Sequence, residues 1–355
     1  MEMSDFWRGR RVLITGHTGF KGGWLATWLE QLGAEVHGIA KLPETDPSLF
    51  EILQLKDRIH SRILDIDDAD ALASAVGGIN PEVIFHLAAQ PLVRRSHEEP
   101  LLTFRTNVMG TAHLLEAARA LEELQAVICV TTDKVYKNQE WAWPYRETDT
   151  LGGKDPYSAS KAAAELVVEA YQRSFYAETN VALLTARGGN VIGGGDWSED
   201  RLVPDLFRAI AAGQPLEIRA PEAVRPWQHV LVLCHGYLEM AQKAISQEIP
   251  KEGAWNFGPS AGDCVSVGSL LELFAAAGAS FDVQVVPDES SRESRLLTLD
   301  SSRARTDLGW SPALDLAEAV RWTAEWYGAV HDRSDILALT LAHINSYTDR
   351  LETKA

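Results

Sequence analysis

The stretch that decides the fold reads Val12-Leu13-Ile14-Thr15-Gly16-His17-Thr18-Gly19-Phe20-Lys21-Gly22-Gly23-Trp24. An apolar run breaks into spaced glycines and then resumes as a helical pattern, which predicts a strand, a phosphate-binding loop and a helix. Glycine permits positive φ and lets backbone N–H groups approach an anion closely. The N-terminus of the helix adds partial positive charge. We therefore expect a pyrophosphate site here, with a tight turn that binds nothing as the alternative.

Length, composition and charge bound the class of protein. The 355 residues are 46% hydrophobic and 23% charged, as in a globular protein with one large α/β domain or a domain plus a smaller lobe. The net charge of −17 argues against nucleic acid and membrane surfaces as partners, because both would repel the chain. An anionic small molecule is compatible if a few arginines converge.

Other features of the composition bear on location and metals. No segment approaches the roughly 18 apolar residues of a membrane span, and the first residues have no leader pattern. The cysteines lack metal-ligand spacing, so we expect buried thiols in a reducing compartment, no metal and a cytoplasmic protein. They are Cys129, Cys234 and Cys264.

Short β-rich runs alternate with helical patterns in the first half of the chain, at 12–15, 35–40, 59–64, 83–87 and 126–131. Near-continuous apolar runs are typical of parallel strands covered on both faces. Right-handed crossovers then predict α/β architecture with a doubly wound parallel Rossmann sheet. We place an NAD(P)-binding domain at 1–187 and a smaller substrate lobe, interleaved with it, at 188–355. The lobe is expected to hold a short strand and turn at 255–259 and helices at 267–277, 301–308, 314–327 and 334–349.

The ends of the predicted strands carry further candidate contacts to a dinucleotide. The second strand ends in Lys41 without the acidic residue usual for NAD, so Lys41 either faces a 2′-phosphate or is solvated. Asp65 closes the third strand and either accepts a hydrogen bond from the adenine amino group or caps the next helix. Small residues at 87–89 let a flat cofactor lie near the backbone. Asn107 falls in a helical stretch, where asparagine is unfavourable unless its amide has a specific partner.

The candidate chemistry lies in two stretches. Thr132-Asp133-Lys134 follows the fifth strand, at the edge where open α/β sheets bind ligands. Tyr157 and Lys161 are four residues apart at the start of a helix, so they share one face. A nearby ammonium favours phenolate and makes a usable base from a phenol whose ordinary pKa is about 10.

The second half supplies arginines beside glycine-rich and proline-stiffened turns. Arg201 follows the glycine-rich run 188–195, while Arg219 and Arg225 each stand close to a proline. Arginine suits bidentate contacts to phosphate, so a nucleotide diphosphate fits this region. For each arginine the alternative is a surface ion pair.

Taken together, these motifs resemble the nucleotide-sugar branch of the extended short-chain dehydrogenase/reductases over nearly all 355 residues, and within it the CDP-glucose 4,6-dehydratases. The likeness rests on the spacing of the loop glycines, on Tyr157 with Lys161, and on the segments 90–94, 132–134, 189–197 and 225–230. It implies a bound NAD and a homodimer joined through helices at 98–121 and 157–175. It also implies a cycle in which a hydride leaves sugar C4 and returns to C6, with water lost in between.

The resemblance also implies catalytic roles. Tyr157 takes the proton of the C4 hydroxyl, Lys161 lowers the phenol pKa and holds the nicotinamide ribose, and Thr132 hydrogen-bonds the same hydroxyl. Asp133 protonates the departing C6 oxygen. Lys134 stands where dehydratases of other sugar nucleotides have glutamate. We expect it to remove the C5 proton as a neutral amine, with anchoring of phosphate or sugar as the alternative.

The expected binding residues form two sets. Those for the cofactor are Gly16, His17, Thr18, Gly19, Phe20, Lys21, Gly22, Asp65, Ile66, Leu87, Ala88, Ala89, Asn107, Tyr157 and Lys161. Those for the nucleotide-sugar substrate are Gln90, Arg94, Asn190, Arg201, Leu202, Arg219 and Arg225.

Two other functions compete with this interpretation. A nucleotide-sugar 4-epimerase would use Tyr157, Lys161 and the same cofactor, but it has no need of the Asp133-Lys134 pair. A non-enzymatic dinucleotide sensor would keep the glycine loop and could lose Tyr157 or Lys161. Both are present, which disfavours the sensor.

Overall fold

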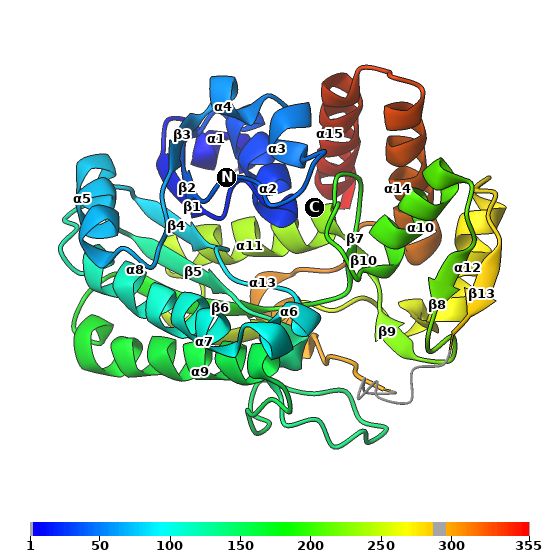
Figure 1. The fold of residues 1–355 in the computed structure, drawn as a ribbon. Coiled ribbons are helices and arrows are strands. Elements are labelled where there is room, and N and C mark those ends of the chain that lie inside the picture. Colours follow the sequence, from blue (N-terminus) through cyan, green and yellow to red (C-terminus); the bar gives the residue numbers. More distant parts are fainter. Residues whose placement is uncertain (1–2, 287–295, 355) are drawn as a thin grey trace.

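A seven-stranded sheet forms the centre of the computed structural model, which describes residues 3–286 and 296–354 (Figure 1). Three short segments lie outside the described residues: 1–2 in the first predicted domain, and 287–295 and 355 in the second predicted domain. All strands are parallel, in the order β11-β6-β5-β4-β1-β2-β3. The predicted doubly wound sheet is confirmed. Its strands are β1 (Arg11–Thr15), β2 (Glu35–Ala40), β3 (His60–Ile63), β4 (Val83–His86), β5 (Ala126–Val130), β6 (Ala182–Arg187) and β11 (Glu252–Asn256).

Alternate residues of the buried strands face two different cores, because successive side chains point to opposite faces of a sheet. On β1, Val12 and Ile14 join the core under α2 (Phe20–Gln31) and α11 (Val230–Ile245), whereas Leu13 joins the core under α5 (Ala69–Ile79) and α8 (Gly110–Ala118). Helix α9 (Pro156–Tyr171) lies beside α8 (Figure 1). Both faces of the sheet are therefore covered, as the apolar runs predict.

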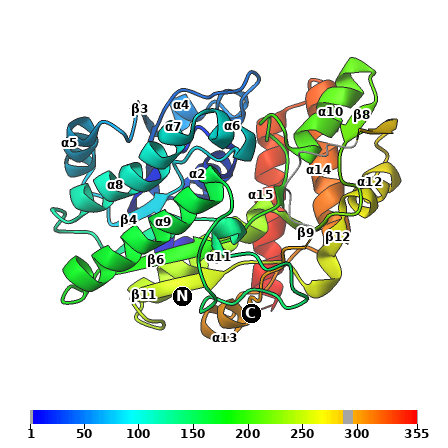
Figure 2. The ribbon, with the colours of Figure 1, turned by 60° about the horizontal axis from the view of Figure 1, so that its bottom comes forward.

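A smaller group of elements lies to one side of the sheet (Figure 2). It contains α10 (Leu202–Ala212), α12 (Val267–Ala276) and α14 (Leu316–His331) with three two-stranded sheets. The sheets pair β7 (Val191–Ile192) with β10 (Gln228–His229), β9 (Val224–Pro226) with β12 (Cys264–Ser266), and β8 (Leu216–Ile218) with β13 (Val283–Val285).

One expectation about the second half needs correction. The strand expected at 255–259 in the smaller lobe lies at 252–256 and forms the edge of the main sheet, paired with β6. Trp255 of this strand is fully buried in the same core as α11, which packs on the main sheet. The chain thus crosses between the two parts more than once, and the domain boundary at 187–188 stays a prediction.

The remaining helices are short, apart from the last. Among the described residues, none has both the length and the apolar character needed to cross a membrane. They are α1 (Met3–Trp7), α3 (Leu49–Ile52), α4 (Leu55–Arg58), α6 (Val93–Glu98), α7 (Pro100–Phe104), η1 (Arg105–Met109), η2 (Asp133–Val135), η3 (Gln172–Tyr176), η4 (Ala261–Asp263), α13 (Ser302–Leu308) and α15 (Ile336–Lys354).

Candidate active site

The glycine loop joins β1 to α2, and its three spaced glycines differ in what surrounds them. Gly16 has φ of +83°, and a Cβ there would lie 2.8 Å from the backbone nitrogen of Ala88. A Cβ at Gly22 would lie 2.1 Å from the carbonyl oxygen of Gly16. At Gly19, just before α2, the nearest atom would be 3.4 Å away, an ordinary contact. The fold therefore requires Gly16 and Gly22, whereas Gly19 leaves a cradle over the helix N-terminus that suits a pyrophosphate.

This difference predicts opposite outcomes for two alanine variants. Gly22→Ala should lower the free energy of unfolding by about 2–3 kcal/mol, because backbone must move to admit the methyl group. Gly19→Ala should stay within about 1 kcal/mol of wild type in denaturant unfolding yet bind NAD at least about tenfold more weakly in calorimetry. Wild-type NAD affinity in Gly19→Ala would show that the cofactor lies elsewhere.

The side chains of His17 and Thr18 bind the protein itself. His17 is fully buried, with Nε2 2.7 Å from Ser61 Oγ, and burial lowers its pKa to about 4, so the ring is neutral. Gly38 makes room for this ring, because a Cβ there would lie 2.3 Å from it. Thr18 donates to the carbonyl oxygen of Lys41 at 3.0 Å. His17 thus holds the loop against β2 and β3, and Thr18 holds it against the end of β2, which leaves mainly backbone groups to face a ligand.

The residues that follow β2, β3 and β4 include two charged side chains and a short run of small or apolar residues. Lys41 Nζ lies 3.0 Å from Asp65 Oδ2, and both side chains are partly exposed. Ile66 is buried against Gly110, and its carbonyl oxygen lies 3.1 Å from Nδ1 of His113. Residues 87–89 after β4 are half-buried, as expected if a flat ring lies over them. Phe20 is half-buried and packs on the core.

Asn107 braces the site from within η1. Its Oδ1 accepts from the backbone nitrogen of Gln90 at 2.8 Å, and its Nδ2 donates to Gln90 O and Ser160 Oγ at 3.1 and 2.8 Å. The amide thus ties the loop after β4 to α9. Gln90 donates from Nε2 to Leu92 O and Thr103 Oγ1, so its side chain also stabilises this loop.

The structure brings Thr132, Tyr157 and Lys161 together where β5 meets α9. Tyr157 is buried, which raises its pKa to about 12, and a hydrogen bond with Thr132 and the charge of Arg201 oppose that rise. Lys161 donates to Val130 O at 3.2 Å, and burial followed by the charge of Lys21 lowers its pKa to about 8. The cation that acts most strongly on the phenol here is Arg201, whereas the sequence pattern pointed to Lys161.

Asp133 is buried and held from both sides. Its Oδ1 accepts from Thr132 Oγ1 and its Oδ2 from Asn190 Nδ2, each at 2.9 Å. Gly189 lies against the carboxylate, since a Cβ there would be 2.2 Å from Oδ1. Within the described part of the chain, the half-buried Lys134 has no ion-pair partner for its ammonium. The carboxyl group of Asp133 is thus fixed by hydrogen bonds, and the ammonium group of Lys134 next to it makes no ion pair with the described residues.

Two ion pairs near these residues were not predicted as pairs, although Arg201 itself was a candidate for the substrate. Glu165, one turn after Lys161, binds Arg187 of β6 with both carboxylate oxygens and accepts from Thr131 and Thr185. This pair fixes α9 against the ends of β5 and β6. Asp196 holds Arg201 at 2.9 Å and its carbonyl oxygen accepts from the hydroxyl of Tyr327. The sequence signal for each was only a charged residue inside an apolar or glycine-rich run.

The predicted substrate arginines gather at the mouth of the site. Arg94 on α6 and Arg219 after β8 bind the same oxygen of Asp200, Oδ1, at 2.8 and 3.2 Å. Arg225 on β9 donates to Val224 O, and half-buried Leu202 begins α10 directly after Arg201. Lys21, half-buried in the first turn of α2, has its pKa lowered to about 8 by burial and by Arg201. Arg94 and Arg219 thus converge on one carboxylate oxygen in a protein of net charge −17.

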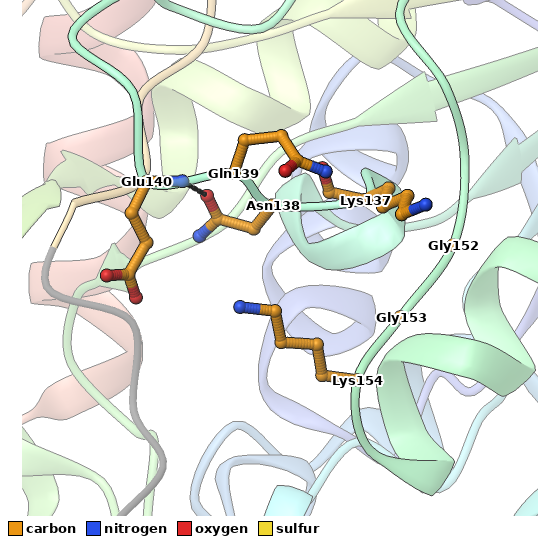
Figure 3. Close-up of a pocket in the computed structure, with 7 residues that line it drawn as sticks. All are labelled: Lys137, Asn138, Gln139, Glu140, Gly152, Gly153 and Lys154. Atoms are coloured by element: carbon orange, nitrogen blue, oxygen red, sulfur yellow. Dashed lines mark hydrogen bonds between the residues drawn. The ribbon is translucent and has the colours of Figure 1, made fainter.

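A pocket of about 430 Å³ lies beside these groups, on the segment between η2 and α9. Figure 3 shows Lys154 reaching into it from below, opposite Asn138 and Glu140. None of Thr132, Asp133, Tyr157 or Lys161 lines it. The pocket is therefore separate from these four candidate catalytic residues. Its lining residues are Lys137, Asn138, Gln139, Glu140, Gly152, Gly153 and Lys154.

Residues of the kinds that bind metals cluster at a different place in the structure from Thr132, Asp133, Tyr157 and Lys161. Among the described residues, the one such group is Glu35, His37 and His60, whose ligand atoms lie within 4.8 Å of one another. They stand at the starts of β2 and β3, whereas the catalytic groups follow the end of β5.

A glycine loop after β1, a bracing asparagine, and a tyrosine and lysine four residues apart on α9 define an extended short-chain dehydrogenase/reductase. Comparison with known families is more specific. Residues 13–323 match the family described as GDP-mannose 4,6 dehydratase, and the chain belongs to this family. The family expected from the sequence is confirmed.

Individual relatives agree with this assignment. CDP-glucose 4,6-dehydratase of Salmonella typhimurium is 43% identical over 97% of both chains. A crystal structure of dTDP-glucose 4,6-dehydratase from Streptomyces venezuelae with NAD bound superposes with a TM-score of 0.78 at 25% identity, covering 92% of this chain and 99% of that one. UDP-glucose 4-epimerase from Thermotoga maritima shares the fold, with a TM-score of 0.80 at 24% identity over 90% and 99% of the two chains.

Proposed function

We propose that this protein is a lyase, a CDP-glucose 4,6-dehydratase that forms CDP-4-keto-6-deoxyglucose and water. The observation that carries the proposal is the second acid–base pair at the end of β5. Asp133 is fixed by Thr132 and Asn190, and Lys134 follows it directly. An epimerase needs no such pair. The 43% identity with the Salmonella enzyme supports both the reaction and the substrate.

The cofactor is NAD, which supplies a reversible hydride acceptor when bound. The cradle over Gly19, the floor at 87–89 and the buried Lys161 fit it. Tyr157 takes the proton of the C4 hydroxyl as C4 is oxidised. Lys134 removes the C5 proton, and Asp133 protonates the C6 oxygen, which leaves as water.

The remaining steps return the enzyme to its starting state without an added oxidant or reductant. A hydride returns to C6, and Lys134 gives its proton back to C5. The proton gained by Tyr157 replaces the one that Asp133 lost. Thr132 holds the C4 oxygen during these steps, while Arg94 and Arg219 bind the diphosphate.

The direct test is turnover without added reductant. Incubation with NAD and, separately, CDP-, UDP-, dTDP- and GDP-glucose should give the ultraviolet band of a 4-keto sugar in alkali with CDP-glucose only. Formation of CDP-galactose without ketone would identify an epimerase instead. No reaction with any of the four would reject the proposal.

The pairing of Lys41 with Asp65 predicts a preference between the two nicotinamide cofactors. Because Asp65 already neutralises Lys41 at 3.0 Å, a 2′-phosphate gains little there, and we expect NAD to bind more tightly than NADP in calorimetry. Asp65→Asn should remove the ion pair of Lys41 and reduce the difference between the affinities for NAD and NADP. Tighter binding of NADP by the wild-type protein would contradict this prediction.

The assembly we propose is a homodimer through the face formed by α7, η1, α9 and η3. Five of the large hydrophobic side chains that are exposed in the described structure lie on these adjoining elements, and Leu101 is 84% exposed. Contiguous exposed apolar surface marks an interaction site. The other four are Phe104, Met109, Leu166 and Phe175.

This face predicts the effect of charge on assembly. The double variant Leu101→Glu, Leu166→Glu should be a monomer of 39.1 kDa in light scattering, because two buried carboxylates per subunit would oppose association. The control Val283→Glu, on exposed β13, should stay dimeric. A wild-type protein that is monomeric at micromolar concentration would rule out the dimer.

We place the protein in the cytoplasm. Cys129 and Cys234 are buried free thiols, as predicted, whereas Cys264 is a free thiol that is only half-buried. Free thiols suit a reducing compartment.

A further inference from the structure

The carboxylate of Asp200 lies between two arginines, Arg94 and Arg219. We propose that its carboxylate is a built-in stand-in for phosphate, which holds Arg94 and Arg219 together until a diphosphate displaces it and so selects against anions that carry less charge. The inference rests on the proposed function in one respect, that these two arginines bind the diphosphate.

The geometry is that of a shared anion. One oxygen, Asp200 Oδ1, accepts from Arg94 Nη1 at 2.8 Å and from Arg219 Nη2 at 3.2 Å. Guanidinium groups bind carboxylate and phosphate oxygens alike, so the two arginines that hold this carboxylate can also hold a phosphate. Without an anion between them, the two cations would repel each other.

The three residues come from different parts of the fold. Arg94 stands on α6, after β4 of the main sheet, and Arg219 follows β8 of the smaller group. Asp200 lies in the loop before α10, with φ of +57°. Asp200 therefore joins the two parts at the mouth of the site, so a ligand that bridges them must first take its place.

The exposure of the trio allows this exchange. The side chains of Arg94, Arg219 and Asp200 are 51%, 37% and 35% exposed, and ion pairs this exposed are weak. A diphosphate brings more charge than one carboxylate and has several oxygens for bidentate contacts, so it can displace Asp200. An anion of single charge offers the arginines nothing that Asp200 does not already supply, so Asp200 acts against it.

Asparagine is the appropriate test substitution, because it has the shape of aspartate without the charge and tolerates the left-handed backbone at this position. Asp200→Gly, which also suits positive φ, is a second variant. The matched control is Glu199→Gln, which removes one negative charge from the exposed neighbouring residue. Melting temperatures establish that each variant is folded.

The measurement is calorimetric binding of inorganic pyrophosphate to protein saturated with NAD, so that the cofactor's own phosphate site is filled. Asp200→Asn and Asp200→Gly should bind pyrophosphate at least about fivefold more tightly than wild type, and Glu199→Gln less than about twofold more tightly. In the double variant Asp200→Asn, Arg219→Gln, the gain in affinity for pyrophosphate should be lost. Equal effects of Asp200→Asn and Glu199→Gln, or weaker binding by both Asp200 variants, would overturn the proposal. Because binding is measured without turnover, this result is separate from any failure to convert CDP-glucose.

Discussion

Tyr157→Phe is expected to lower turnover of CDP-glucose by about 10³-fold, within the range that a general base contributes. The phenol is buried beside Thr132 at the end of β5, and phenylalanine keeps the ring while removing the atom that accepts the C4 proton. Single-turnover rates with saturating NAD measure the effect, and a wild-type melting temperature serves as the control for folding. A loss of less than tenfold would mean that another group takes this proton.

Arg201 allows the same base to be tested by pH. Burial raises the pKa of Tyr157 to about 12, and the charge of Arg201 opposes this rise. Removing the cation raises the phenol pKa further, so in Arg201→Gln the rising limb of the pH–rate profile should move to higher pH. Arg208→Gln is the matched control, since Arg208 stands on α10, which begins directly after Arg201, and pairs with Asp205. If the rising limb lies at the same pH in Arg201→Gln and Arg208→Gln, Arg201 is not the cation that lowers the pKa of Tyr157.

Lys134→Ala should separate the steps of the reaction. In heavy water, oxidation at C4 should persist, while deuterium incorporation at C5 and formation of the keto product fall together by about 10²–10⁴-fold. The physical reason is that the C5 proton becomes acidic only beside the C4 ketone and still needs a base within reach. Asp133 lies nearby, held by Thr132 and Asn190, but in the proposed cycle it is the acid that protonates the C6 oxygen, so it does not also take the C5 proton.

Lys137→Ala is the control, because it removes the same charge three residues later in the neighbouring pocket. It should exchange and eliminate like wild type. A Lys134→Ala enzyme that exchanges and eliminates at a near-normal rate, with only its affinity for substrate reduced, would assign Lys134 to anchoring.

The sheet could be predicted from sequence because its strands are buried on both faces. The apolar run at β5 (Ala126–Val130) is continuous and buried throughout, so composition alone marks it. The edge strand β11 was placed in the wrong part of the fold, since its pairing with β6 spans about 70 residues and leaves no local pattern. Long-range pairing is a property of topology that a short window of sequence does not carry.

The site was predictable in its motifs and less so in its geometry. Tyr157 and Lys161 stand on one face of a helix because their spacing dictates it. The inward direction of His17 depends on room over Gly38, which only the folded strands define. The shared use of Asp200 by Arg94 and Arg219 joins three separate segments. Single arginines beside prolines indicated an anion site without showing what holds the arginines before a ligand arrives.

The central claim is that one active site moves a hydrogen from C4 to C6 of the same sugar. The most direct measurement is turnover of CDP-glucose carrying deuterium at C4, in ordinary water, followed by nuclear magnetic resonance of the product. We predict CDP-4-keto-6-deoxyglucose with the deuterium in the C6 methyl group and no net change in NAD. Deuterium retained at C4 of CDP-galactose, or a keto product whose methyl group holds none, would contradict the account.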